Sequence, residues 1–180
     1  KLAESHSISV LKRPDNLSTD TSNVVDAVFH VLENLKSKGE TFDLVVLLQP
    51  TSPLRLPQDI DTALNLLIQS ETDGIISVVE VSDHHPARMY EIDNNNGLNC
   101  FLESGETIRR QDLNKLYIRN GAIYIIKTKA LFMERTLMPK KKIAYVMNKR
   151  WAVNIDEELD LDVLEVVIKK WNEKYGDFNY

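Results

Sequence analysis

Residues 44–55, with the sequence LVVLLQPTSPLR, constrain the fold of this chain more than any other stretch. The five consecutive apolar residues Leu44–Leu48 are typical of a strand buried on both faces, as in a parallel sheet. Pro50 and Pro53 lack backbone N–H donors, so the ladder cannot continue through them. The polar loop residues are therefore expected at the carboxyl end of the strand, where open α/β sheets bind ligands. These residues are Gln49, Thr51 and Ser52.

Apolar periodicities along the rest of the chain predict an α/β protein. Apolar residues at three- and four-residue steps predict a helix over 24–35 that Gly39 ends, and a second helix that Pro57 opens. Thr128 is expected to cap a short helix. A closing helix is expected to carry Leu161, Leu164, Val167 and Ile168 on its apolar face. Apolar runs predict further strands at 8–11, 75–79, 122–126 and 143–147, with Asn120-Gly121 as the turn entering the third of these. A strand, helix and strand over 44–79 would form a right-handed βαβ unit.

Composition limits the compartment and the partners. The formal net charge of −5 argues against nucleic acid or an anionic membrane as a partner. No apolar run approaches the roughly 20 residues that span a bilayer. Cys100 is the only cysteine of the sequence, so no internal disulfide forms, and a reducing cytosol is expected. We therefore expect a cytoplasmic protein without nucleic-acid or membrane partners.

Several motifs resemble those of the acylneuraminate, or CMP-sialic acid synthetase-like, cytidylyltransferases, which activate sialic acid and related nonulosonic acids. They are RPDNLSTDTS at 13–22, LLQPTSPLR at 47–55, HHPAR at 84–88, RRQDL at 109–113, NGAIYI at 120–125 and NIDEELD at 154–160. The matching segments follow the family's order and cover nearly the whole chain. The resemblance implies an α/β fold with a mostly parallel, Rossmann-like nucleotide-binding sheet flanked by helices.

The resemblance also assigns binding roles. Its nucleotide-binding residues, which hold the cytosine and ribose, are Arg13, Thr21 and Ser22. Its substrate-binding residues are Gln49, Thr51, Ser52, Arg88, Arg110, Asn120 and Tyr124. The residues alone allow other interpretations: an ordinary loop after the first buried strand, a solvated arginine pair at 109–110, and an N-cap for the following helix at Asp20, Thr21 or Ser22.

A metal site is implied near the closing helix. Relatives bind Mg²⁺ against the triphosphate with two aspartates, and Asn154 replaces the first of them here. An amide oxygen is a neutral and weaker ligand, so Asp156 is the best single ligand and, with Arg110, a candidate catalytic residue. Asp156 equally suits the N-cap of the closing helix, and both roles are compatible.

Residues 89–111 are expected to leave the main sheet. The turn signal DNNNG at 93–97 separates two short alternating segments, which predicts a hairpin. A lone hairpin is marginally stable, so it needs a surface to pack on. The resemblance implies a dimerisation arm and hence a homodimer.

The reaction implied is transfer of CMP from CTP to the anomeric hydroxyl of a nonulosonic acid, with release of pyrophosphate and with Mg²⁺ as cofactor. Leu137-Met138 replaces aromatic residues common in sialic acid enzymes, which favours a legionaminic or pseudaminic acid. One alternative is a 3-deoxy-manno-octulosonate cytidylyltransferase. Another is a catalytically inactive nucleotide- or partner-binding relative, because Asn154 replaces an aspartate and we expect a single domain over 1–180 that lacks the family's N-terminal phosphate loop.

Overall fold

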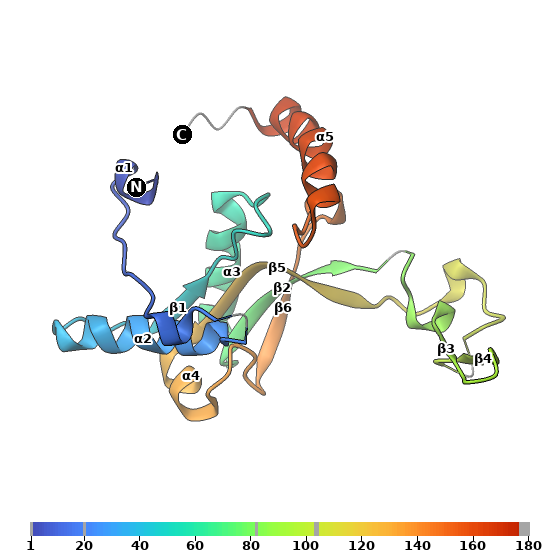
Figure 1. The fold of residues 1–180 in the computed structure, drawn as a ribbon, viewed down its shortest axis with the longest axis horizontal. Helices are drawn as coiled ribbons and strands as arrows, with labels where there is room; N and C mark the ends of the chain where they lie inside the picture. Colours follow the sequence, from blue (N-terminus) through green and yellow to red (C-terminus); the bar gives the residue numbers. More distant parts are fainter. Residues whose placement is uncertain (1, 20, 82, 103–104, 177–180) are drawn as a thin grey trace.

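The computed structural model describes residues 2–19, 21–81, 83–102 and 105–176 (Figure 1). Within them the helices are α1 (Leu2–Ser5), α2 (Val24–Ser37), α3 (Pro57–Gln69), α4 (Thr128–Glu134) and α5 (Glu158–Tyr175). The strands are β1 (Leu44–Leu47), β2 (Gly74–Glu80), β3 (Tyr90–Ile92), β4 (Leu98–Cys100), β5 (Tyr117–Lys127) and β6 (Lys142–Val146). None of the described helices is both long and apolar enough to cross a membrane.

The central sheet is mixed, so the prediction of a mostly parallel sheet is wrong. The strand order is β1-β5-β2-β6. Strand β5 runs antiparallel to both β1 and β2, and only β2 and β6 pair in parallel. Strands β1 and β2 do run in the same direction, joined by α3, but β5 lies between them. An apolar strand segment has no direction that its composition reveals, which is why the sequence did not predict this insertion.

Two expectations about strands fail because the strands lack a neighbour. Strand β1 lies at an edge of the described sheet and Val46 is 38% exposed, so β1 is not buried on both faces. Residues 8–11 form no strand, and Ile8 and Val10 are exposed. Alternating apolar residues make a strand only when a partner strand completes their hydrogen bonds.

Helices cover both faces of the sheet. On one face, Phe29 of α2 and Leu131 of α4 pack against Tyr124 of β5. On the other face, Leu67 of α3 packs against Ile123 and its neighbours of β5. Successive residues of β5 therefore enter opposite cores, as the period of two of a strand requires.

The ends of the helices differ from several predicted caps. Asn23 caps α2, because its Oδ1 accepts from Val25 N at 3.0 Å; Asp20 lies outside the described residues, and Thr21 and Ser22 do not cap the helix. Lys127 is the N-cap of α4, in place of the predicted Thr128. Glu157, in place of Asp156, is the N-cap of α5. Two predicted boundaries are confirmed: α2 ends just before Gly39, and α3 begins at Pro57.

Helix α5 lies apart from the central sheet in Figure 1. It is anchored by Trp171, which packs with Trp151 and Leu54 in a separate cluster. Of the four residues predicted on its apolar face, Leu164 and Val167 pack against this cluster, whereas Leu161 and Ile168 are exposed. The contacts of α5 therefore come from one face that runs from Leu164 to Tyr175.

The hairpin prediction is confirmed, since β3 and β4 pair antiparallel with Tyr90 opposite Cys100. Residues 81–116, which we call the arm segment, leave the sheet after Glu80 and return at Tyr117, its partner in the ladder. Figure 1 shows this segment projecting from the sheet, at the right of the view. Its role in dimerisation and the division of the chain into domains stay predictions.

Candidate functional site

A bulge in β5 brings Asn120 and Gly121 close to Gln49 and Ser52 of the loop after β1. Asn120-Gly121 lies within β5, and the register of β2 against β5 shifts at this point, so the two residues are not a turn that precedes the strand. Gly121 has φ +76°, and a Cβ there would lie 2.7 Å from Gln49 Oε1 and 2.8 Å from Ser52 Oγ. Only glycine fits both the conformation and the space.

Ser52 joins three segments of the chain. Its side chain is 3% exposed, and its Oγ lies 2.7 Å from Asn120 O and 3.0 Å from Asn154 Oδ1. The neighbouring carbonyl of Thr51 accepts from Ile155 N at 2.8 Å. The loop after β1 is thereby tied both to the bulge of β5 and to the segment that leads into α5.

Ser77 and Arg55 support this arrangement, although the sequence did not single them out. Ser77 Oγ donates to Asn120 Oδ1 at 2.6 Å and accepts from Ile123 N at 2.8 Å. Arg55 Nη1 donates to the carbonyls of Gln49 and Ser52 at 3.0 and 2.6 Å. A serine inside the apolar run IISVV was a signal for such a buried hydrogen bond.

We call these hydrogen-bonded residues the β1-end network, and it reaches the protein surface at Asp156. Its members are Gln49, Ser52, Arg55, Ser77, Asn120 and Asn154. At its surface, Asn154 Nδ2 donates to Asp156 Oδ2 at 2.6 Å, and Asp156 is exposed. Within the described residues, no group of three or more His, Cys, Asp or Glu could hold a metal. Asn154 directs its amide nitrogen toward Asp156 and its amide oxygen toward Ser52. The exposed carboxylate of Asp156 still fits Mg²⁺, which takes few protein ligands when substrate phosphates complete its shell.

A second site lies at the base of the arm segment. A cavity of about 200 Å³, which we call the arm-base cavity, opens there among charged side chains. Both Arg88 and Arg110 line it, so the structure brings these two predicted substrate residues together. The complete lining is Glu80, Val81, Asp83, His85, Arg88, Arg110, Leu113, Asn114, Lys115 and Lys149.

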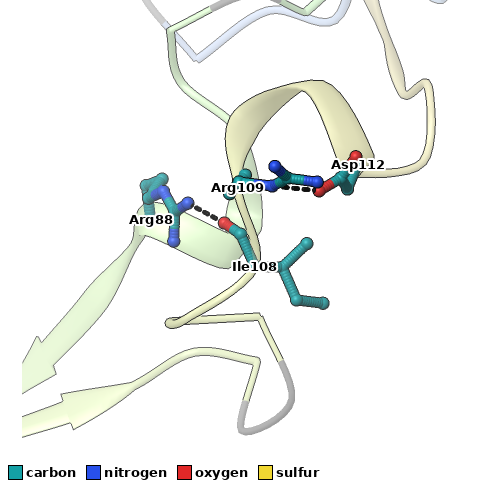
Figure 2. A network of polar contacts seen from close by, with 4 residues as sticks. All are labelled: Arg88, Ile108, Arg109 and Asp112. Atoms are coloured by element: carbon teal, nitrogen blue, oxygen red, sulfur yellow. Dashed lines mark hydrogen bonds and ion pairs between the residues drawn. The ribbon is translucent and has the colours of Figure 1, made fainter.

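The two arginines have different surroundings. Arg88 donates to the carbonyls of Gly105 and Glu106, at 3.0 and 2.5 Å, and to that of Ile108 (Figure 2). Arg110 forms an ion pair with Asp83 at 2.9 Å, and both side chains are about two-thirds exposed. Arg88 thus holds the returning part of the arm segment, while Arg110 is paired at the surface.

Tyr90 gives this segment a further tie. Its hydroxyl donates to Glu106 Oε1 at 3.1 Å. The pKa of Tyr90 is raised above its ordinary value of 10.0, mainly because this hydrogen bond favours the neutral phenol. The phenol of Tyr90 is therefore in its neutral, donating form at neutral pH.

The remaining predicted residues lie elsewhere. Ser22 Oγ and Thr21 Oγ1 both approach Thr19 Oγ1, at 2.8 and 3.2 Å, and Arg13 is exposed. Among the described hydrogen bonds, none joins these residues to the β1-end network. Tyr124 is 8% exposed within the core beneath α2, so little of its ring is open to a ligand. Their predicted roles stay predictions.

Comparison with known proteins identifies the family. The chain is 31% identical over 153 residues to the N-acylneuraminate cytidylyltransferase of Streptococcus agalactiae, covering 85% of this chain and 36% of that protein. It is 29% identical over 171 residues to the post-translational flagellin modification protein B of Campylobacter coli, covering 93% and 71%. It is 27% identical over 157 residues to the pseudaminic acid cytidylyltransferase of Campylobacter jejuni, covering 87% and 67%. The chain belongs to the acylneuraminate cytidylyltransferase family.

The match has limits in length. No family model matches this chain. The chain spans about a third of the length of the Streptococcus agalactiae relative. A second N-acylneuraminate cytidylyltransferase, from Escherichia coli, matches 98% of this chain and 41% of its own length at 27% identity. The similarity therefore runs through nearly all of this chain and through only part of the larger family members.

Proposed function

We propose that this protein transfers CMP from CTP to the anomeric hydroxyl of a nonulosonic acid and releases pyrophosphate. The observation that carries the proposal is a similarity that covers most of the chain, to proteins named as N-acylneuraminate and pseudaminic acid cytidylyltransferases. The octulosonate alternative has no such relative among the matches reported above. An inactive relative is the remaining alternative, and turnover distinguishes it.

The reaction is an in-line displacement at the α-phosphorus of CTP. The sugar oxygen forms a bond to phosphorus, the bond from phosphorus to the pyrophosphate oxygen breaks, and the hydroxyl proton leaves to solvent. Little covalent chemistry is required of the protein, so positioning and charge neutralisation supply most of the acceleration. The tied loop of Gln49, Thr51 and Ser52 supports this role, because a loop fixed before substrate arrives does not need to be ordered by it.

Mg²⁺ is the proposed cofactor, with Asp156 as its main protein ligand. When bound, the ion would offset the negative charge on the phosphates. Asn154 Oδ1 lies near Ser52 Oγ and keeps a second lone pair for a ligand role, while its Nδ2 orients Asp156. Restoring the family's aspartate with Asn154→Asp would add a second carboxylate at this point.

The nucleotide and sugar subsites are proposed as the resemblance assigns them. Arg13, Thr21 and Ser22 would hold the nucleotide, and Arg110 would contact the sugar at the arm-base cavity. Exposed apolar side chains of the arm segment, among them Ile92 and Leu98, support a homodimer built on this segment. The substrates of such an enzyme are metabolites, so a cytoplasmic location is proposed as well.

The proposal is tested by pyrophosphate release from CTP and Mg²⁺ in the full-length protein. N-acetylneuraminic, legionaminic, pseudaminic and 3-deoxy-manno-octulosonic acids are supplied one at a time. We expect turnover with one of the first three, and with pseudaminic or legionaminic acid ahead of N-acetylneuraminic acid. Turnover with the octulosonic acid alone, or with no acid, contradicts the proposal.

A further inference from the structure

The arm-base cavity carries an excess of positive charge on an acidic protein. Four basic and two acidic side chains line it, although the whole chain has a formal net charge of −5. The basic residues are Arg88, Arg110, Lys115 and Lys149, and the acidic ones are Glu80 and Asp83. A concave site with one prevailing sign of charge attracts ligands of the opposite sign.

Three of the four cations are already engaged. Arg88 donates to three carbonyls of the arm segment, and an incoming anion would have to displace them. Arg110 is paired with Asp83, and Lys115 Nζ lies 3.4 Å from Glu80 Oε2. Among the described residues that line the cavity, Lys149 is the only basic one for which the structure gives no side-chain hydrogen bond or ion pair.

The backbone of Lys149 is held firmly in place. Lys149 opens a single 3₁₀ turn, Lys149–Trp151, whose N-cap Asn148 accepts from Arg150 N at 3.0 Å. The turn ends at Trp151, which is buried against Trp171 with ring centroids 5.4 Å apart. A cation on an anchored turn loses less freedom on binding than one on a loose loop.

We propose that Lys149 binds the carboxylate of the acidic sugar substrate in the arm-base cavity, an assignment that rests on the proposed function. The ammonium of Lys149 gains a charge-assisted hydrogen bond without breaking one inside the protein. Arg88 then acts through the arm segment that it holds rather than by contact with the sugar. Lys149 and Asp156 lie on one continuous segment, which places the carboxylate and phosphate subsites on a common support.

The chain offers a matched control for testing Lys149. Arg150 is the next residue of the same turn, is also exposed and basic, and lines a different cavity with Trp151 and Lys174. Binding of N-acetylneuraminic, legionaminic and pseudaminic acids is measured by calorimetry with the wild-type protein, Lys149→Gln, Lys149→Arg and Arg150→Gln. Circular dichroism checks that each exposed variant is folded.

We expect Lys149→Gln to weaken binding of the preferred acid about tenfold, since a hydrogen bond to a charged group is lost. Lys149→Arg keeps the charge and should stay within about threefold of wild type, as should Arg150→Gln. Equal binding by Lys149→Gln and wild type overturns the inference, and so does a wild-type protein that binds none of the three acids.

Failure of the proposed function looks different. If the wild-type protein binds an acid through Lys149 but releases no pyrophosphate with CTP, the proposed catalytic function is wrong and the assignment of Lys149 to binding is kept. Turnover that is insensitive to Lys149→Gln, together with equal binding by that variant, defeats the assignment and leaves the function standing.

Discussion

The β1-end network and the arm-base cavity use polar groups in opposite ways. In the network, neutral side chains such as Ser52, Ser77 and Asn120 are satisfied by one another and by the backbone. In the cavity, charged side chains such as Arg110 and Asp83 are paired but remain mostly exposed. Both regions contain residues that the family resemblance assigns to one substrate.

The difference in burial sets what each region can do. An unsatisfied polar group in the buried network costs about 1–3 kcal/mol, so its geometry is fixed before any ligand arrives. An exposed ion pair contributes about 0–1 kcal/mol, so its members can exchange partners at little cost. The network therefore keeps the shape of the site, and the cavity keeps charges that a substrate can use.

Gly121→Ala should have the largest effect on stability. The added Cβ meets Gln49 and Ser52 and also forces alanine into a left-handed conformation. We expect a loss of about 3 kcal/mol in the free energy of unfolding, measured by urea denaturation. Gly39→Ala is the matched control, because Gly39 has φ +84° and nothing within 4 Å of a Cβ, and should lose about 1 kcal/mol. Equal losses would mean that crowding at the bulge is unimportant.

Ser77→Ala should follow, with a loss of about 2 kcal/mol, because Asn120 Oδ1 and Ile123 N both lose a buried partner. Thr62→Ala removes an exposed hydroxyl that donates to Gln58 O and should change stability by less than about 0.5 kcal/mol. Thermal and urea unfolding of both variants measure the difference. A Ser77 variant as stable as the Thr62 variant contradicts the account of the network.

Arg110→Gln should affect substrate binding rather than stability, unlike the two substitutions at the β1-end network. The exposed pair with Asp83 contributes little, so stability should change by less than about 0.5 kcal/mol. The KM for the sugar acid should rise about tenfold, because a cation of the cavity is lost. Arg109→Gln is the control, since Arg109 pairs with Asp112 and does not line the cavity (Figure 2). A stability loss without a change in KM would place Arg110 with the structural residues.

The smallest effect is expected at acid pH, at the start of α5. Asp160 accepts from the backbone N–H groups of Asp156 and Glu157, at 2.8 and 2.9 Å, and these bonds lower its pKa below the ordinary value of 3.8. Its contribution to stability is therefore present above pH 3.8 and is lost as pH falls through the lower, folded pKa.

Amide NMR shifts of Asp156 and Glu157, followed between neutral and acid pH, should show a midpoint below 3.8. Asp160→Asn should remove this transition while leaving the arm-base cavity unchanged. A midpoint at or above 3.8 contradicts the assignment of Asp160 as the group that holds the segment carrying Asp156.

Local patterns were enough to predict most helices and strands. Three confirmed predictions depend only on neighbours in sequence. They are helix α2 with Gly39 beyond its end, the start of α3 at Pro57, and the hairpin around 93–97. The strand at 8–11 and the burial of β1 depended on partner strands, and they are wrong. The direction of β5 is set by the whole sheet, which no local pattern encodes.

The candidate site was predicted in part for the same reason. Residues of the loop after β1 were named from the strand and its prolines, and the structure joins them to Asn120 and Asn154. Ser77 was missed because its partner Asn120 is 43 residues away in sequence. Arg55 donates both to nearby carbonyls of its own loop and to the distant carbonyl of Ala122, and only the fold shows the latter contact. Lys149 carried no motif at all, and only the cavity identifies it.

The pairing of Glu80 with Tyr117 has a consequence for how this family can diverge. The chain enters and leaves the arm segment at one rung of the ladder, and Val81 N donates to Leu116 O at 2.9 Å just beyond it. An insertion whose two ends already meet can lengthen, shorten or change its surface without moving the strands that close it. The arm segment can therefore change in length and in surface while β2 and β5, which close it, keep their pairing.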